Sequence, residues 1–291
     1  MLALMEVSHR ASYAEMRTIE VAQEIPATEM EAFLAGVIGT TADETLQNIG
    51  VEFLLRRNHL EESLAAEAPL SAFIPMSIID GDRVVAEVGS IDDDPMGRLV
   101  HHARQHIAFT IPWLARALQR ARDRHNLTGR QVAGWANRAG LFGDGRLVTD
   151  GVDAWLAGDH RKAAHILIPQ IEAGVRTFIG RCGRPTTKPH PQMRRARMVF
   201  TMGELLFHPE TTTALGPMGP HLILHLRTLY TDPRGLNWRN DLAHGLINAD
   251  SMDGEMSLWL IHTLLLLGGV MRFGQPASEP ADESGTEAAP A

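Results

Sequence analysis

The most chemically dense segment of this sequence is Asn237–Gly245, which runs Asn-Trp-Arg-Asn-Asp-Leu-Ala-His-Gly. On a helix, Asn240 and His244 are four residues apart and therefore share a face. Arg239 lies about 100° further round the helix, and its long side chain can still reach that face. Histidine can move a proton near neutral pH, a guanidinium can hold a phosphate, and an asparagine amide can orient either group. These three side chains form the candidate catalytic set.

Glu172 and Arg176 lie some seventy residues before this segment and are four residues apart in the order that favours an ion pair within one helix. Glu172 is also placed to reach across to Arg239 and fix its guanidinium. We therefore predict supporting roles for Glu172 and Arg176, together with Asn237 and Asp241 from the dense segment itself.

A purely structural interpretation of the same residues stays open. Asn237 can cap the helix, and Asn240 can bond its own backbone. Arg239 can pair with Glu172 or with Asp241, in which case the cluster only holds helices together.

The pattern Arg-Asn, three residues, then His resembles the signature of the HEPN superfamily, and its wider context resembles a bacterial group within it, the domain-of-unknown-function 4209 family. The resemblance covers roughly residues 70–272. It is carried by Gly158-Asp159, Ala164, Leu167-Ile-Pro-Gln-Ile-Glu172, Arg176 and Asn237-x-Arg-Asn-x-x-Ala-His-Gly245. It implies an all-helical bundle that forms a homodimer. It also implies a metal-independent endoribonuclease without a cofactor, whose site at a two-fold cleft leaves a 2′,3′-cyclic phosphate. Non-catalytic binding of RNA or nucleotides is the alternative within such proteins.

A basic island lies between Ala173 and Gly203, where the sequence has no Asp or Glu although the net charge of the chain is −8. Such a stretch can follow a phosphate backbone and give salt-sensitive RNA binding, or it can be a solvated loop. Besides Arg176, the candidate RNA-binding residues are Arg181, Arg184, Lys188, Arg194, Arg195 and Arg197.

Composition narrows the other possibilities. The single cysteine, Cys182, excludes cysteine-cluster zinc sites, and the negative net charge argues against a general polyanion binder. His102 and His106 have helical spacing next to His101 but lack a zincin glutamate, so we predict no metal. The longest apolar stretch, Leu258–Phe273, is shorter than the ~20 residues of a bilayer span, and the N-terminus does not resemble a signal peptide. We therefore expect a cytoplasmic protein with no membrane contact.

The hydrophobic periodicity predicts a mainly α fold. Residues 1–145 form a helical region with a β-hairpin at 72–89, where an Asp-Gly turn joins two β-rich runs. Residues 148–273 form a helical bundle, and residues 274–291 form a disordered tail. Pro112 is expected to kink or restart its helix. Further expected features are a cap at Thr149 or Asp150, a cap at Asp159, and helices over about 193–207, 220–230, 238–247 and 254–270.

Overall fold

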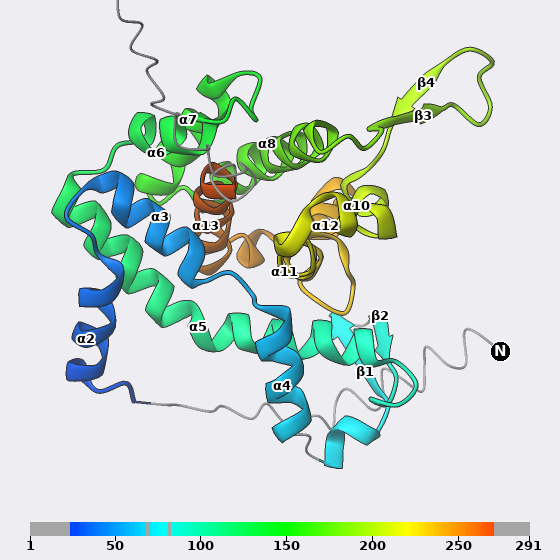
Figure 1. The fold of residues 1–291 in the computed structure, drawn as a ribbon, viewed down its shortest axis with the longest axis horizontal. Coiled ribbons are helices and arrows are strands. Elements are labelled where there is room, and N and C mark those ends of the chain that lie inside the picture. The colour runs from blue at the N-terminus through cyan, green and yellow to red at the C-terminus, as the bar shows by residue number, and fades with distance from the viewer. Residues whose placement is uncertain (1–23, 68–69, 81–82, 271–291) are drawn as a thin grey trace, which may run out of the picture.

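The computed structural model describes residues 24–67, 70–80 and 83–270, and it is mainly helical, as predicted (Figure 1). Its first half contains α2 (Ala27–Val37), α3 (Ala42–Glu52), α4 (Arg57–Glu67), η1 (Leu70–Phe73), β1 (Met76–Asp80), β2 (Arg83–Val88), α5 (Pro95–His125) and α6 (Gly129–Asn137). Its second half begins with α7 (Gly145–Leu156), α8 (His160–Arg181), β3 (Thr187–Pro189), β4 (Arg197–Val199), α9 (Met202–Leu206) and α10 (Pro209–Ala214). It ends with η2 (Gly216–Met218), α11 (Gly219–Leu226), the π-helical turn η3 (Arg227–Thr231), α12 (Trp238–Ala243), η4 (Ala249–Ser251) and α13 (Gly254–Val270). Within the described ranges, every helix is too short or too polar to span a lipid bilayer.

Helix α13 is the centre of the fold and has the bounds that the sequence predicts. It packs against α3, α5, α6 and α8, and almost every side chain along it is buried. Trp135 of α6 donates its indole N–H to the Leu265 carbonyl at 3.1 Å. A Cβ on Gly268 would lie 2.6 Å from Trp135, so only glycine allows the two helices to approach this closely. A helix that is apolar on all sides must be surrounded by others, and the sequence pattern fits that position.

A single hydrophobic core joins the two halves of the chain. Buried residues from Leu34 in α2 to Leu267 in α13 belong to one continuous cluster. The predicted division near residues 145–148 therefore separates elements that share one core, because α13 from the second half packs on α3, α5 and α6 from the first.

Helix α5 runs without interruption through Pro112, where the sequence analysis predicted a kink or restart. A proline inside a helix costs about 3 kcal/mol or more because it removes one backbone hydrogen bond. The helix nevertheless continues because it buries residues on both sides of the proline, including Ile107 and Leu114, while Pro112 itself is exposed. Tertiary packing outweighs the local signal.

Strands β1 and β2 form the predicted antiparallel hairpin, and residues 81–82 at its turn lie outside the described residues. The pairing changes register between Ile78 and Ile79: Ile78 pairs with Ala86, but Ile79 pairs with Val84. Val85 is thus an extra residue, a β-bulge that the sequence analysis did not predict.

A second hairpin replaces most of the helix predicted over 193–207. Strand β3 pairs with β4, and Figure 1 shows this hairpin projecting from the end of α8 away from the rest of the molecule. Helix α9 begins only at Met202, where Thr201 and Glu204 form a capping box. The signal Thr-x-x-Glu is present in the sequence and marks a helix start at that point rather than at Met193.

The starts of α7 and α8 agree with the sequence prediction to different degrees. Helix α8 is capped by Asp159, as predicted, through a bond from the Lys162 backbone N–H. Helix α7 starts earlier than expected because Asp144 caps it, and Thr149 lies inside the helix and bonds the Gly145 carbonyl. The predicted tail at 274–291 lies outside the described residues.

Candidate functional site

The dense segment folds into the short helix α12, which ends earlier than the predicted Ile247. Gly245 has φ of +66°, and its N–H bonds the Leu242 carbonyl at 3.2 Å, while the Leu246 N–H bonds the Asp241 carbonyl at 2.8 Å. These two bonds form a Schellman motif, which terminates a helix at a left-handed glycine. His244 is consequently the C-cap residue, at the exposed end of α12.

Arg239 is bound to Glu172 of α8 through both arms of its guanidinium. Its Nε donates to one carboxylate oxygen at 2.7 Å and its Nη2 donates to the other at 3.2 Å. The two side chains are only 18% and 13% exposed, so this is a partly buried, two-pronged ion pair. The contact between Glu172 and Arg239, predicted from the sequence across 67 positions, is confirmed.

Glu172 is the common anchor of three elements. Its carboxylate also accepts from Arg176 Nη2 at 2.8 Å, which confirms the predicted pair within α8, and from the backbone N–H of Met202 at 3.1 Å. Arg176 in turn donates to the Phe200 carbonyl at 3.3 Å. One carboxylate therefore fixes α8, the start of α9 and α12 relative to one another.

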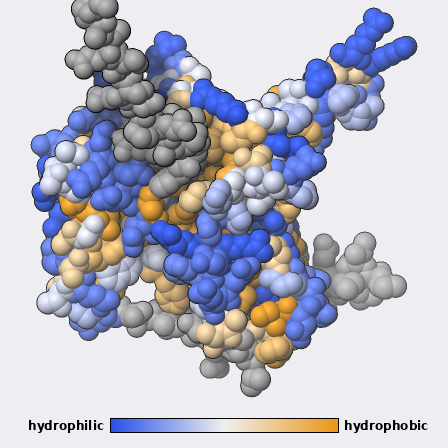
Figure 2. Space-filling view, in the orientation of Figure 1, coloured by the Kyte–Doolittle hydropathy of each residue, from blue (hydrophilic) through white to orange (hydrophobic). Residues whose placement is uncertain are grey.

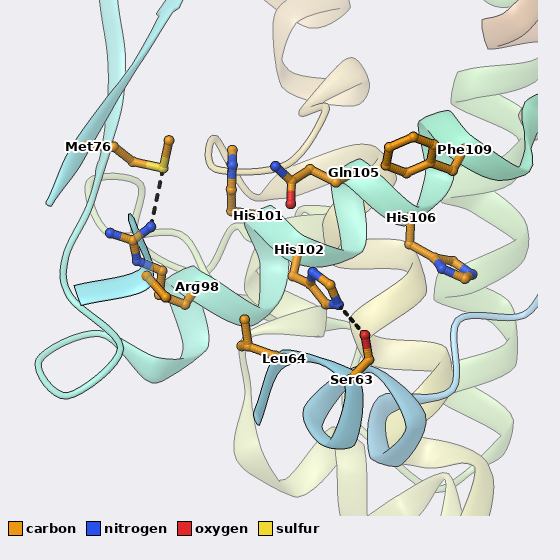
Figure 3. Close-up of a pocket in the computed structure, with 10 residues that line it drawn as sticks. Ser63, Leu64, Met76, Arg98, His101, His102, Gln105, His106 and Phe109 are labelled. Carbon is orange, nitrogen blue, oxygen red and sulfur yellow. Dashed lines mark hydrogen bonds between the residues drawn. The ribbon is translucent and has the colours of Figure 1, made fainter. Parts of the chain in front are cut away.

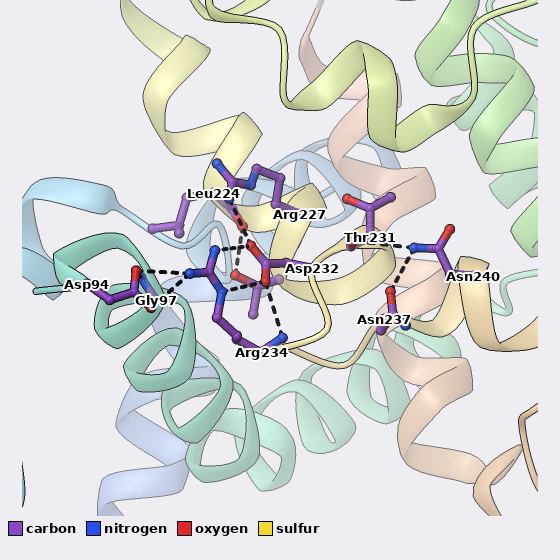
Figure 4. Close-up of polar contacts among 10 residues, drawn as sticks. Asp94, Gly97, Leu224, Arg227, Thr231, Asp232, Arg234, Asn237 and Asn240 are labelled. Atoms are coloured by element: carbon purple, nitrogen blue, oxygen red, sulfur yellow. Dashed lines mark hydrogen bonds and ion pairs between the residues drawn. The ribbon is translucent and has the colours of Figure 1, made fainter. Parts of the chain in front are cut away.

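Asn240 connects the catalytic candidates to the loop that precedes α12 (Figure 4). Its oxygen accepts from Arg239 Nη1 at 3.2 Å, and its amide nitrogen donates to the Thr231 carbonyl at 3.3 Å and to Asn237 Oδ1 at 2.8 Å. Asn237 donates to Asp241 at 3.0 Å. Asn237 stands at the N-cap position with φ of +53°, but its side chain does not cap the helix, which corrects that alternative.

The structure does not bring Arg239 to the face that carries His244. Five positions apart on a helix, the two residues point roughly 140° away from each other. Arg239 turns inward to Glu172, whereas the imidazole of His244 is exposed and forms no hydrogen bond with any described residue. The sequence analysis expected the long arginine side chain to bridge this angle. It does not, because the buried carboxylate offers the guanidinium two hydrogen bonds at once.

A network of ion pairs before α12 was missed by the sequence analysis (Figure 4). Asp232 is fully buried and accepts from Arg227 at 2.8 Å and from Arg234 at 2.9 Å. Arg234 also reaches Asp94 at 3.0 Å, at the start of α5. Burial raises the pKa of Asp232, but hydrogen bonds from Arg234 and Arg227 outweigh it and leave this pKa below its ordinary value. The network ties the loop before α12 to α5.

Most side chains of the basic island are already bound to other residues of the chain, in ion pairs or in hydrogen bonds. Arg184 pairs with Glu210 and Lys188 with Glu204, acids that lie just after the island in the sequence. Arg181 donates to the carbonyls of Ala139 and Gly140, and Arg197 bonds Thr187 across the β3–β4 hairpin. The part of the basic island that is open to a phosphate backbone is therefore a smaller surface.

That smaller surface is the tip of the β3–β4 hairpin. Arg194 and Arg195 are exposed there, and neither forms a hydrogen bond or an ion pair with a described residue. Met193 beside them is 54% exposed. In Figure 2 the projecting arm ends in hydrophilic side chains. Within the predicted RNA-binding set, these two arginines can meet a phosphate without first breaking an ion pair or a hydrogen bond to a described residue.

The three neighbouring histidines of α5 line a different cavity of about 380 Å³. Figure 3 shows His101, His102 and His106 pointing in different directions, and His102 lies 3.0 Å from the Ser63 hydroxyl. Within the described ranges, no three His, Cys, Asp or Glu side chains gather in a way that could hold a metal ion.

Around α12 the structure thus offers an accessible imidazole at the end of the helix, and a guanidinium and an amide that hydrogen bonds hold at its start. What this site does must be inferred from the residues of this chain, because comparisons with known family models, with curated proteins and with solved structures find no match.

Proposed function

We propose that this chain acts on RNA as a metal-independent endoribonuclease of the HEPN type, in which His244 transfers the proton. The observation that carries the proposal is the contrast within α12. Arg239 and Asn240 are fixed by hydrogen bonds, while the imidazole five residues later is exposed and unpartnered. A packing role accounts for the fixed residues but leaves His244 without a task.

The reaction needs one base and one acid. An imidazole takes the proton of a ribose 2′-hydroxyl, whose oxygen attacks the adjacent phosphorus. The bond from phosphorus to the 5′-oxygen breaks, and a second imidazole, in its protonated form, gives that oxygen a proton. The products are a 2′,3′-cyclic phosphate and a 5′-hydroxyl, so no metal or redox partner is required. Since each chain has one His244, a homodimer with both α12 ends at one cleft supplies the base and the acid.

Arg239 has a positioning role in this proposal. With Nε and Nη2 on Glu172 and Nη1 on Asn240, its positive charge is largely offset by the carboxylate. It fixes α12 so that the His244 backbone has one position, while Arg194 and Arg195 of each hairpin supply the contacts to the RNA phosphates.

A structural scaffold is the second candidate, and the Glu172–Arg239 ion pair is the observation that favours it. In that case the pair locks α12 onto α8, and the exposure of His244 has no consequence. The two candidates differ in one respect: only the nuclease requires the imidazole.

The test is incubation of the pure protein with total RNA in the presence of a chelator. We expect the wild type to cleave and His244→Ala to be inactive with a melting temperature within a few degrees of wild type. His165→Ala, which removes another exposed histidine, is the matched control and should cleave normally. An active His244→Ala variant, or a wild type that leaves RNA intact as a dimer, would refute the nuclease and favour the scaffold.

A further inference from the structure

A second cavity lies against the other side of α12, between that helix and the β1–β2 hairpin. Its volume is about 250 Å³. The hairpin wall consists of Ile78, Ile79 and Val85, and the facing wall includes Leu236 and Trp238. Trp238 and Asp241 are the residues of α12 that line it, so the cavity is distinct from the contact of Arg239 with Glu172.

The β-bulge shapes the hairpin wall. Side chains of a regular strand alternate between its two faces, and a bulge adds a residue that does not follow this alternation. The extra residue Val85 shifts the pairing at this point, and both isoleucines as well as Val85 itself line the cavity. Bulges commonly redirect a side chain next to a binding site.

Polar side chains make up much of the rest of the cavity lining. Asn237 and Asp241 are bonded to each other at 3.0 Å and therefore form a rigid edge. Asn248, just before the turn η4, and Ser251, at its end, also line the cavity and are exposed. The side-chain amide of Asn248 and the hydroxyl of Ser251 form no hydrogen bond with a described residue, so donors and acceptors are available to a ligand.

The geometry points to a site for a single RNA base in this cavity, an inference that rests on the proposed action on RNA and names how the substrate is recognised. A base offers two apolar faces and a polar edge, and proteins bind unpaired bases between apolar or aromatic side chains with hydrogen bonds to that edge. The cavity offers apolar side chains to the faces of a base and polar groups to its edge. It is smaller than the about 300–1,000 Å³ of pockets for drug-sized ligands, which suits one heterocycle rather than two.

The position of the cavity relates it to the proposed chemistry. Asp241 lines it, and His244 follows three residues later at the exposed end of the same helix. A base held beside Asp241 would direct the attached ribose and phosphate toward that end of α12.

The test is calorimetric titration of the wild type with each of the four ribonucleoside 5′-monophosphates. We expect saturable binding of at least one of them. Val85→Phe, which fills the cavity, should weaken that binding at least 10-fold, and Asn248→Ala at the exposed rim should weaken it several-fold. Val84→Phe, the same change at a neighbouring position that does not line the cavity, is the matched control and should bind like the wild type.

His244→Ala separates this inference from the nuclease proposal, because His244 does not line the cavity and its loss should leave nucleotide binding unchanged. Nucleotide binding without RNA cleavage would uphold the base site and refute only the nuclease. Absence of saturable binding for all four nucleotides would overturn the base site. Equal weakening by Val84→Phe and Val85→Phe would do so as well, as would unchanged binding in Asn248→Ala.

Discussion

The carboxylate of Asp232 and the histidine pair His225–His262 are both buried. Only Asp232 is surrounded by groups of opposite charge. Asp232 is held by Arg227 and Arg234. His225 and His262 lie with ring centroids 5.0 Å apart, and both side chains are 0% exposed. Among the described residues, neither ring nitrogen of His262 and only one of the two on His225 has a hydrogen-bond partner.

The protonation states differ for the same reason. Burial drives the pKa of His225 well below its ordinary value, with a further lowering from His262 nearby. Burial also lowers the pKa of His262 to about 3, against a smaller opposing effect from the Gly50 backbone. Phe53 and Trp259 surround the pair with aromatic rings. This fold therefore keeps buried charges where arginines meet carboxylates, close to α12, and keeps its core histidines neutral.

The largest expected effect is acid destabilisation through the histidine pair. Each histidine is neutral when folded but binds a proton below about pH 6.5 when unfolded. The stability that the two neutral histidines contribute is therefore fully present above pH 6.5. It is lost as the pH falls from there toward the pKa values of the folded state. For His262 the loss is about 1.4 kcal/mol per pH unit, or about 3 kcal/mol by pH 4.5, and His225 adds to this loss in the same direction. Urea unfolding from pH 7 to pH 4.5 measures it.

His262→Leu is the variant that isolates this effect, since it removes one buried titrating group and keeps an apolar side chain. The slope of unfolding free energy against pH should fall by roughly half. An unchanged slope would show that the acid response arises elsewhere. The carboxylate Asp232 has its pKa below 3.8 and should contribute only at lower pH.

The next largest effect is expected from Asp232→Ala. This change leaves Arg227 and Arg234 without their shared carboxylate in a buried setting, which should cost roughly 3–5 kcal/mol in urea unfolding at pH 7. Asp232→Asn keeps the shape and one acceptor and should cost less. A loss below about 1 kcal/mol for Asp232→Ala would mean that the network adds little to stability.

A smaller effect is expected from Arg239→Lys, because lysine keeps the charge but cannot make the two-pronged contact with Glu172. Thermal or urea unfolding should show a loss of about 1–2 kcal/mol. Glu172→Gln, which also releases Arg176 and Met202, should cost more than Arg239→Lys. The opposite order would argue against Glu172 as the common anchor.

The smallest effect on stability is expected at the hairpin tip. Arg194→Glu combined with Arg195→Glu should change the unfolding free energy by less than about 0.5 kcal/mol. The same variant should bind RNA more weakly at low salt, with a shallower salt dependence. Arg184→Glu with Lys188→Glu, at positions that are already ion-paired, is the control. Unchanged RNA affinity at low salt in the tip variant would refute the phosphate contact.

Local patterns predicted the elements whose signals lie within a few residues. These are the strands β1 and β2 of the first hairpin, the cap at Asp159, and the apolar helix from Gly254 to Val270. The prediction was wrong at Pro112 and over 193–207. At Pro112 core packing on both sides outweighed the proline, and over 193–207 a capping box placed the helix start later. In the candidate site, the sequence predicted the Glu172–Arg239 contact. It did not predict that this contact keeps Arg239 away from the helix face that carries His244.

The amino-acid sequence alone indicates which chemical groups lie in one short segment, because helix periodicity fixes neighbours three and four positions apart. Only the tertiary structure decided that Arg239 is buried against Glu172 while His244 faces solvent. It also decided that Asp232 collects two arginines and that a β-bulge shapes a cavity beside α12. A charged side chain near several partners settles where it gains the most hydrogen bonds at the least cost of desolvation. That choice depends on elements brought together from distant parts of the chain.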